Sequence, residues 1–397
     1  MKTRVIFVMS NLDLGGAQKS LISLLSIFNY QKYEVDLLLF QPGGSLIPQV
    51  PKEVNILYLD DKSSLYFKST KEIILKNLYK LRLLPIKDIL KINFKKVLRV
   101  SNGHGSQFRW EAIGKYLSPI EKQYDVAIGY LQSSPVYYVV DKIHANKKIA
   151  WFHSDYKAGG YNRELDKKYY NQVEKVISVS DSAKQVLKDV FNDMTDKFEV
   201  VHNIIPYSTI KQLANERNPF KNNNKIKIVS LGRIDYVKGY DLQISVAKRM
   251  AKDGYDFKWY VIGGGNNLSL YLKEIKNYNL EKYFCFLGPK NNPYPYLKFC
   301  DIYVQTSRYE SYCIAVGEAK FFNKPIVSTN FTGISEQLIN EKTGLIVDIN
   351  EDAIYKGVTR MIIDEELRES IQVNLSKLES SNNDSMSKLY NLIDKQE

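Results

Sequence analysis

Glu310 and Glu318 are the residues whose type and spacing point most directly to chemistry. The β-branched and aromatic run over residues 301–305 predicts a strand before them, and Cys313 and Ile314 open a segment of helical composition. A strand that turns into a helix leaves unpaired N–H groups at the turn, and such groups can bind a phosphate. Two glutamates eight positions apart can lie on one side of that turn. They would accept hydrogen bonds from two hydroxyl-bearing parts of one ligand.

A pair of cations precedes the two glutamates. Residues 226–231 predict a strand, which is followed by Gly232, Arg233 and, five positions after Arg233, Lys238. A guanidinium and an ammonium near a strand end can neutralise the negative charge of a phosphate-bearing ligand. Taken alone, the cations and the glutamates are also typical of a solvated surface. Their order along the chain favours the functional interpretation.

The run Ser-Arg-Tyr-Glu-x7-Glu-Ala resembles the Glu-x7-Glu motif of family 4 retaining glycosyltransferases, such as those of bacterial capsular and exopolysaccharide synthesis. These enzymes have the GT-B fold, an α/β fold with two Rossmann-like domains facing each other across a cleft. The resemblance implies that Glu310 contacts the donor sugar and Glu318 the ribose. It also implies that Arg233 and Lys238 clamp the pyrophosphate, so that Arg233, Lys238 and Glu310 are candidate catalytic residues.

Glycines after several other predicted strands fit the same resemblance. Gly15 and Gly16 lie between a strand predicted over residues 5–9 and a helix, where missing side chains let the backbone approach a phosphate closely. Gly264 is at a position where the family often has an aspartate. The resemblance therefore implies no side-chain contact at this position, only a close approach of the backbone to the donor. The full set of expected donor-binding residues is Gly15, Gly16, Gly232, Gly263, Gly265, Gly288, Pro289, Cys313, Ile314 and Glu318.

A fourth catalytic candidate is His153, which follows a strand predicted over residues 149–152. Functional side chains gather at the carboxyl ends of parallel strands. The resemblance implies that this histidine lies near the reacting sugar carbon. A lone histidine is often structural, but Ser154 and Asp155 directly after it favour a functional role.

Chain length and the alternation of predicted strands with helices indicate an α/β protein of two domains. We expect an acceptor-binding domain over residues 1–205, a linker over 206–224 and a nucleotide-sugar-binding domain over 225–375. Members of the family often fold a C-terminal helix back onto the first domain, and residues 376–397 are expected to do the same.

Cysteine usage and the start of the chain predict a cytoplasmic protein. The three cysteines are an odd number without metal-ligand spacing, which is typical of reduced thiols. The apolar run over residues 5–9 is too short for a signal peptide, and no segment approaches transmembrane length. The Asp-x-Asp metal signature of the other large glycosyltransferase fold is absent from the sequence. We therefore expect no catalytic metal and no cofactor, with a UDP-linked nucleotide sugar as co-substrate.

The net charge of +12 is concentrated in one segment. Residues 62–115 hold thirteen Lys and Arg against three acids, so ten of the twelve surplus charges lie there. Apolar residues recur at helical spacing in this segment, while Lys87, Lys91 and Lys95 line another side. Such helices suit an anionic membrane surface, which predicts attachment to the inner face of the cell membrane and a lipid-linked saccharide acceptor. An ordinary solvated face is the alternative. Nucleic acid is not expected, because no recognised binding module accompanies the charge.

The sequence thus predicts a retaining glycosyltransferase that moves a sugar from a nucleotide-sugar donor to a hydroxyl of a saccharide acceptor, in bacterial surface polysaccharide synthesis. Three other classes stay open: a catalytically inactive GT-B homologue that binds a sugar or a partner protein, a GT-B nucleotide-sugar epimerase, and a two-domain solute-binding protein. The intact glutamates and cations argue against the first, the Glu-x7-Glu spacing against the second, and the missing signal peptide against the third.

Overall fold

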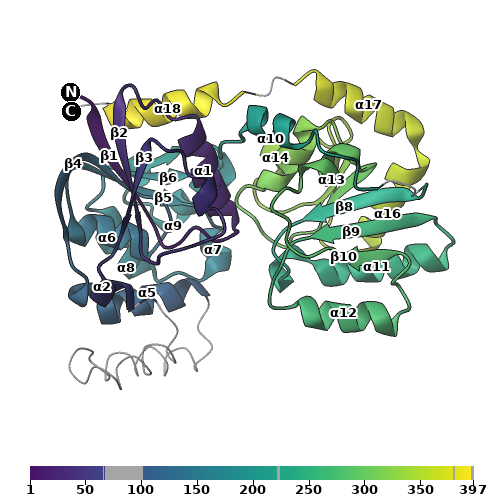
Figure 1. Cartoon of the computed structure of the whole chain (residues 1–397). Helices are drawn as coiled ribbons and strands as arrows, with labels where there is room; N and C mark the ends of the chain where they lie inside the picture. Colours follow the sequence, from purple (N-terminus) through teal and green to yellow (C-terminus); the bar gives the residue numbers. More distant parts are fainter. Residues whose placement is uncertain (66, 68–101, 221–223, 379–380, 395–397) are drawn as a thin grey trace. The chain divides into compact units, whose positions relative to one another are not determined.

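The computed structural model describes residues 1–65, 67, 102–220, 224–378 and 381–394. The chain forms two compact units (Figure 1). Unit 1 comprises Met1–Ile204 and Asp384–Glu397, and unit 2 comprises Ile205–Asn383. Each unit is built around its own sheet of parallel strands.

A seven-stranded parallel sheet forms the centre of unit 1, in the order β3-β2-β1-β4-β5-β6-β7. Its strands are near-continuous apolar runs, because helices cover both faces of a parallel sheet; Val5, Phe7 and Met9 of β1, for example, are fully buried. The strand order changes direction between β1 and β4, and the loops after such neighbouring strands form a topological switch point. The strands are β1 (Thr3–Met9), β2 (Tyr33–Leu39), β3 (Val54–Tyr58), β4 (Ile120–Gly129), β5 (Ile143–Phe152), β6 (Lys175–Ser178) and β7 (Phe198–Val200).

The helices of unit 1 connect these strands, and the last of them comes from the far end of the chain. They are α1 (Gly16–Ser26), α2 (Asp61–Leu65), α5 (Asn102–Ile113), α6 (Ser134–Lys142), α7 (Tyr156–Gly159), α8 (Arg163–Tyr170), α9 (Asp181–Val190) and α18 (Asn383–Asp394), with short 3-10 turns η1 (Ile47–Gln49), η2 (Gly114–Tyr116) and η3 (Thr195–Lys197).

Helix α18 packs beside the start of β2. Tyr390 stacks on Tyr33 with ring centroids 5.3 Å apart, and it also contacts Phe28. The Tyr390 hydroxyl accepts a hydrogen bond from the Asn29 N–H at 2.9 Å, and Asp394 accepts one from the Tyr33 hydroxyl at 2.8 Å. These contacts fix α18 to the strand that pairs with β1.

Unit 2 contains a six-stranded parallel sheet in the order β10-β9-β8-β11-β12-β13. Its order changes direction between β8 and β11, which places the loops after these two strands next to each other. The strands are β8 (Ile226–Leu231), β9 (Phe257–Ile262), β10 (Phe284–Phe286), β11 (Ile302–Gln305), β12 (Ile326–Thr329) and β13 (Leu345–Val347). The helices are α10 (Tyr207–Leu213), α11 (Tyr240–Lys252), α12 (Leu268–Asn277), α13 (Tyr294–Phe299), α14 (Ile314–Phe321), α15 (Ile334–Gln337), α16 (Glu351–Ile363) and α17 (Glu365–Ser376), with the 3-10 turn η4 (Tyr236–Lys238).

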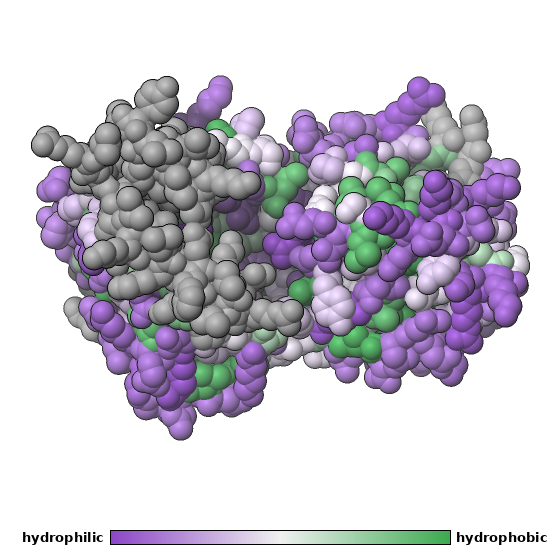
Figure 2. Space-filling model, turned by 90° about the horizontal axis from the view of Figure 1, so that it is seen from below, coloured by the Kyte–Doolittle hydropathy of each residue, from purple (hydrophilic) through white to green (hydrophobic). Residues whose placement is uncertain are grey.

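The α/β class and the two Rossmann-like sheets confirm the fold predicted from the sequence. Among the coloured residues in Figure 2, hydrophilic ones predominate, with smaller apolar areas between them, while the apolar strands are buried in both units. No helix among the described residues is both long enough and apolar enough to span a lipid bilayer. Most of the basic segment expected to face a membrane, including Lys87, Lys91, Lys95 and Lys96, lies outside the described residues.

Candidate active site

The candidate site in unit 2 is built by the loops that follow β8 and β11. Because these two parallel strands are neighbours, their carboxyl ends bring the two loops together. Lys238, at the end of the first loop, donates a hydrogen bond to the Glu310 carboxylate of the second. Both side chains are largely buried, with 19% and 16% of their surfaces exposed. The structure therefore joins two of the sequence-predicted residues directly.

The Lys238 ammonium stays charged in this setting. Burial acts to lower its pKa, but the Glu310 carboxylate and, less strongly, Cys313 and Asp235 raise the pKa above its ordinary value. An ammonium held in this way is a fixed positive charge, which is what a diphosphate requires.

A chain of buried hydrogen bonds holds the Glu310 carboxylate from the other side. Ser307 Oγ donates to Glu310 at 2.9 Å, and Gln305 Nε2 donates to Ser307 Oγ at 2.7 Å. The Tyr303 hydroxyl in turn donates to Gln305 Oε1 at 2.6 Å. Tyr303, Gln305 and Ser307 are all buried, so each bond is shielded from water. The orientation of Glu310 is thus set by residues of the strand that precedes it.

Arg308 ties the two loops together. Its guanidinium makes a bidentate pair with Asp241 at 2.5 and 2.9 Å, donates to the Tyr236 carbonyl at 2.6 Å and stacks on the Tyr236 ring. Thr306 Oγ1 donates to the Lys238 carbonyl at 2.9 Å. The second loop therefore fixes both the backbone and the side chain of Lys238.

Gly239 allows the close approach of the two loops. Its φ of +68° lies in the left-handed region, and a Cβ there would stand 2.1 Å from the Thr306 carbonyl oxygen. Any larger residue would push the loops apart.

Arg233 lies in the same loop as Lys238 but is much more exposed. Its side chain is 71% exposed and pairs with Asp235 Oδ2 at 2.6 Å. The other oxygen of Asp235, Oδ1, is buried and has no hydrogen-bond partner among the described residues. Both expected clamp cations are therefore paired with carboxylates of the chain.

The N-terminus of α14 follows the Glu310 loop. Cys313 is its N-cap, and the Gln337 side chain bonds both backbone groups of Cys313, accepting from its N–H at 3.0 Å and donating to its carbonyl at 2.9 Å. Burial raises the pKa of the Cys313 thiol to about 12, so it is uncharged. Ile314 is the first helical residue. Glu318, 3% exposed, lies one turn further along and accepts a hydrogen bond from the Tyr294 hydroxyl at 3.3 Å.

The glycines of unit 2 pack against neighbouring backbone. A Cβ on Gly263 would stand 1.8 Å from the Gly232 carbonyl oxygen, and one on Gly265 would stand 2.2 Å from the Ile234 carbonyl oxygen. The loop after β9 thus lies directly on the loop after β8. Gly288 has open space around its Cβ position, and a Cβ on Gly264 would stand 3.7 Å from Pro289 Cδ in the loop after β10. At Gly263 and Gly265, the backbone of the loop after β9 therefore lies close to the backbone of the loop after β8.

Three of the predicted site residues, Gly15, Gly16 and His153, lie in unit 1. Gly15 is the N-cap of α1 and Gly16 its first residue, without a side-chain cap. His153 follows β5, and its ring is parallel to that of Trp151 at 5.8 Å. Burial lowers the His153 pKa to about 3, and its Nε2 has no hydrogen-bond partner among the described residues. The imidazole is therefore neutral at physiological pH.

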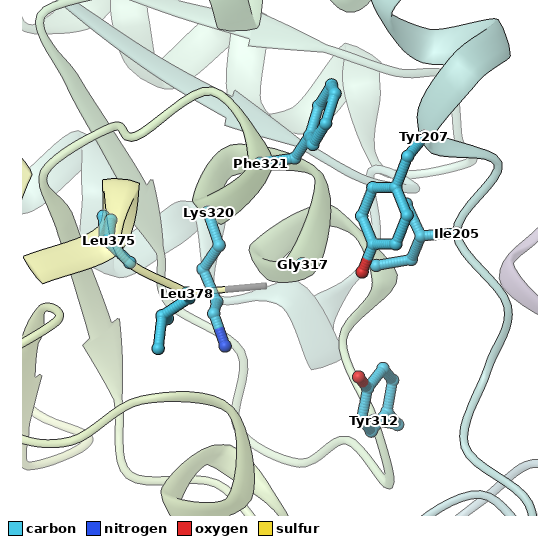
Figure 3. Close-up of a pocket in the computed structure, with 8 residues that line it drawn as sticks. All are labelled: Ile205, Tyr207, Tyr312, Gly317, Lys320, Phe321, Leu375 and Leu378. Atoms are coloured by element: carbon cyan, nitrogen blue, oxygen red, sulfur yellow. The ribbon is translucent and has the colours of Figure 1, made fainter. Parts of the chain in front are cut away.

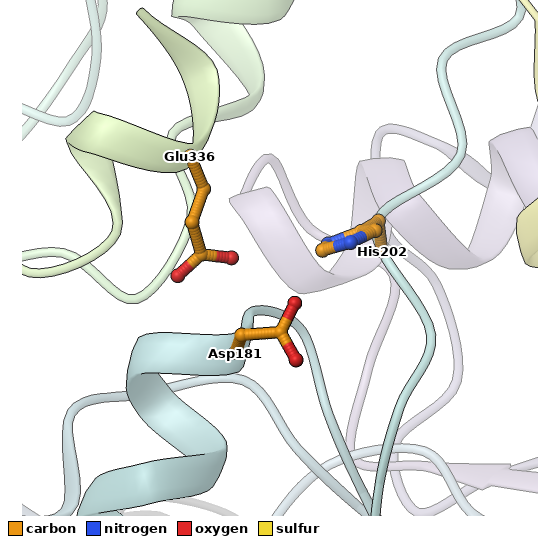
Figure 4. Close-up of side chains that lie close together, drawn as sticks. All are labelled: Asp181, His202 and Glu336. Carbon is orange, nitrogen blue, oxygen red and sulfur yellow. The ribbon is translucent and has the colours of Figure 1, made fainter.

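Unit 1 brings together two further polar residues that the sequence did not single out. Asp181 begins α9, and His202 lies just after β7 with its Nδ1 3.2 Å from the Val179 carbonyl oxygen (Figure 4). Sequence reasoning also missed the supporting residues of unit 2. The proximity of Asp235 to Arg233 could have been noticed, since they are two positions apart. The other missed residues include Asp241, Tyr294, Tyr303, Gln305, Thr306, Ser307, Arg308 and Gln337.

Comparison with known sequences finds a family model that matches residues in the second half of the chain. Residues 212–377 match the family model described as "Glycosyl transferases group 1". An uncharacterized glycosyltransferase of Methanocaldococcus jannaschii is 28% identical over 215 residues, which cover 50% of this chain and 52% of that protein. The amylovoran biosynthesis glycosyltransferase AmsD of Erwinia amylovora is 26% identical over 210 residues, covering 52% and 58%. The chain thus spans about half the length of these curated relatives.

Solved structures match over nearly the whole chain. The HepE protein of Anabaena, solved in complex with UDP-glucose, has a TM-score of 0.70 at 14% identity, covering 98% of this chain and 99% of its own. A glycosyltransferase of Rickettsia africae has a TM-score of 0.69 at 19% identity, with complete coverage of both chains. Together the comparisons show that the chain has the GT-B fold and that residues 212–377 of its second unit are similar to glycosyl transferases group 1.

Proposed function

We propose that the protein is a retaining glycosyltransferase, which moves a sugar from a UDP-linked donor to a hydroxyl of a saccharide acceptor. The observation that carries this proposal is the contact between Lys238 and Glu310, close to Cys313 at the N-terminus of α14. Phosphates favour such cations and helix N-termini. Carboxylates such as Glu310 and the buried Glu318 accept hydrogen bonds from sugar and ribose hydroxyls. The UDP-glucose bound to HepE supports a UDP-linked donor.

In the proposed reaction, the bond between the sugar C1 and the phosphate oxygen breaks. The acceptor oxygen forms its bond to C1 on the face from which the phosphate departs, so the anomeric configuration is retained. The acceptor proton passes to the departing phosphate. Arg233, Lys238 and the N–H groups at the start of α14 take up the charge of the leaving group, while Glu310 holds the sugar.

His153 is proposed to lie near the reacting carbon. Because burial keeps its imidazole neutral, it would act there through hydrogen bonding and not as a cation. We propose that the reaction needs no metal, since the sequence lacks the Asp-x-Asp signature and offers two cations and a helix N-terminus for the diphosphate.

The proposed acceptor is a lipid-linked saccharide at the cytoplasmic face of the cell membrane, in bacterial surface polysaccharide synthesis. The concentration of positive charge in residues 62–115 supports a location near anionic lipid. The similarity to a glycosyltransferase of amylovoran biosynthesis supports a polysaccharide pathway.

A donor panel tests the proposal. The purified protein is incubated with nucleotide sugars that differ in base and sugar, and release of the nucleoside diphosphate is followed. Release from a UDP-sugar, reduced roughly a hundredfold in Arg233→Ala, is the expected result. NMR of the released or transferred sugar then reports the anomeric configuration. A product of inverted configuration would refute retention, and interconversion of the donor without release would indicate an epimerase.

A further inference from the structure

A pocket in unit 2 is lined by residues other than Lys238 and Glu310. It has a volume of about 210 Å³ and lies between α14, the start of α10 and the end of α17 (Figure 3). Its apolar walls include Ile205, Phe321, Leu375 and Leu378. A Cβ on Gly317 would stand 2.4 Å from Ile205 Cδ1, so the glycine lets Ile205 reach the surface of α14.

The polar side of this pocket contains one cation. Lys320, partly buried, donates through Nζ to the Gln337 carbonyl at 2.6 Å. Among the described residues no carboxylate lies within 4.0 Å of this ammonium. Burial lowers the pKa of Lys320, which reflects the cost of holding an unneutralised charge away from water. Buried cations are normally paired with anions, so an anion would relieve this cost.

Two tyrosines complete the polar side. Figure 3 shows the hydroxyl groups of Tyr207 and Tyr312 directed toward each other beside Gly317. The Tyr207 ring also packs on Phe321, with ring centroids 5.1 Å apart. An ammonium and two hydroxyls next to an apolar wall are suited to a ligand with an anionic end and an apolar body.

The pocket is distinct from the proposed donor site, although both use α14. Glu318 faces Tyr294 of α13, whereas Gly317, Lys320 and Phe321 form a separate stripe at helical spacing. The pocket is also smaller than the roughly 300–1,000 Å³ of typical drug-sized sites. Its size fits a single ring or a short branched chain.

We propose that this pocket binds a small organic anion, a carboxylate attached to a compact apolar body, through Lys320. The proposal goes beyond the transfer reaction and does not depend on it. Benzoate is a suitable probe, and benzamide is its neutral counterpart of the same shape.

Calorimetric titration of the full chain at pH 7 tests the proposal. We expect benzoate to bind the wild type at least tenfold more tightly than benzamide does. Lys320→Met should abolish this preference, because it keeps most of the length of the side chain and removes the charge. Leu378→Trp, at a half-exposed rim position, should weaken both probes by filling the pocket.

Arg233→Ala separates this pocket from the proposed donor site. Benzoate affinity unchanged in Arg233→Ala supports the pocket, whereas its loss would place the probe among the diphosphate-binding residues and overturn the proposal. Equal binding of benzoate and benzamide, equal binding to wild type and Lys320→Met, or no binding at millimolar benzoate would each overturn it as well. Thermal unfolding of each variant confirms that it is folded at the temperature of the titration.

Discussion

Lys238 and Glu310 form a buried ion pair between the loops that follow β8 and β11. Lys238 is expected to bind the pyrophosphate and Glu310 the sugar, so loss of either residue should impair transfer. Because the pair is buried, its loss should also lower stability. Removing one partner of a buried pair leaves the other charge uncompensated. Arg233 provides the contrast, because its own side chain is largely exposed.

Replacing Lys238 should therefore lower both stability and turnover, whereas replacing Arg233 should lower turnover alone. Lys238→Met is expected to lower the free energy of unfolding by about 3 kcal/mol, because Glu310 stays buried without its partner. Arg233→Ala should leave stability within about 0.5 kcal/mol of wild type. Both should reduce turnover by roughly a hundredfold, since each removes a charge that stabilises the leaving diphosphate. Urea unfolding and nucleotide release measure the two quantities. Turnover within a factor of about two of wild type for both variants would contradict the clamp.

The two glutamates should separate nucleotide binding from transfer. Glu318→Ala is expected to weaken UDP binding, because its proposed partner is the ribose of donor and product alike. Glu310→Ala should leave UDP affinity nearly unchanged and damage transfer, because its proposed partner is the sugar. Calorimetry with UDP distinguishes them. Tyr294→Phe serves as a control, since it removes the hydrogen bond to Glu318 but keeps the carboxylate. Loss of UDP binding in Glu310→Ala alone would reverse the two roles.

Gly239 and Gly254 offer a matched test of loop geometry. Both have positive φ, +68° and +82°, but a Cβ on Gly239 would stand 2.1 Å from the Thr306 carbonyl oxygen, whereas one on Gly254 would meet no atom within 4 Å. Gly254→Ala should cost only about 1 kcal/mol, the strain of the left-handed conformation. Gly239→Ala should cost more and should also weaken UDP binding, because it displaces the Lys238 loop. Equal unfolding free energies for the two variants would show that the contact with Thr306 is unimportant.

The fold could largely be predicted from the sequence because the relevant signals are local. Apolar runs such as those of β1 and β8 are characteristic of buried parallel strands, and the glycines after them mark turns. The contacts of the site are not local. Arg308 and Asp241 are 67 positions apart, and no pattern near either residue identifies the other. Only the neighbouring positions of β8 and β11 bring them together.

His153 shows the same limit for a single residue. Its position after a strand could be predicted, but its neutral state could not. The lowered pKa arises from burial, and the imidazole packs against the rings of Trp151 and Tyr130, the latter from the loop after β4, which pairs with β5. Burial depends on the packed unit, so residue type and spacing do not determine it.

The charge concentrated in residues 62–115 predicts salt-sensitive binding to anionic vesicles. Replacing Lys87, Lys91, Lys95 and Lys96 with Gln should abolish sedimentation with vesicles that contain anionic lipid, since each lysine contributes about 1 kcal/mol near such a surface. Wild type should be released at high salt and should bind neutral vesicles less well. Donor hydrolysis in the quadruple variant controls for folding. Equal sedimentation of wild type and variant would favour an ordinary solvated surface.

Asp166 should give unit 1 an unusual dependence of stability on pH. It is 1% exposed and accepts hydrogen bonds from the Tyr156 hydroxyl, at 2.7 Å, and from Tyr137. Burial raises its pKa from 3.8 to about 6, despite these bonds. The folded protein therefore holds this proton more tightly than the unfolded chain does. The stability that Asp166 contributes is fully present below pH 3.8 and is lost as the pH rises to about 6.

His153 acts in the opposite direction, because its folded pKa of about 3 lies below the ordinary value of 6.5. Its contribution is fully present above pH 6.5 and falls as the pH is lowered toward 3. Over the shared interval each group changes stability by about 1.4 kcal/mol per pH unit, so the two slopes oppose each other in the wild type. Asp166→Asn removes the slope that arises from Asp166. Between pH 4.5 and 6, the free energy of unfolding of this variant should therefore rise by about 1.4 kcal/mol per pH unit relative to that of the wild type. Urea unfolding at several pH values measures the difference, with His153→Gln as the control expected to change the slope in the opposite sense. Parallel curves for wild type and Asp166→Asn would mean that Asp166 does not carry its proton in the folded protein.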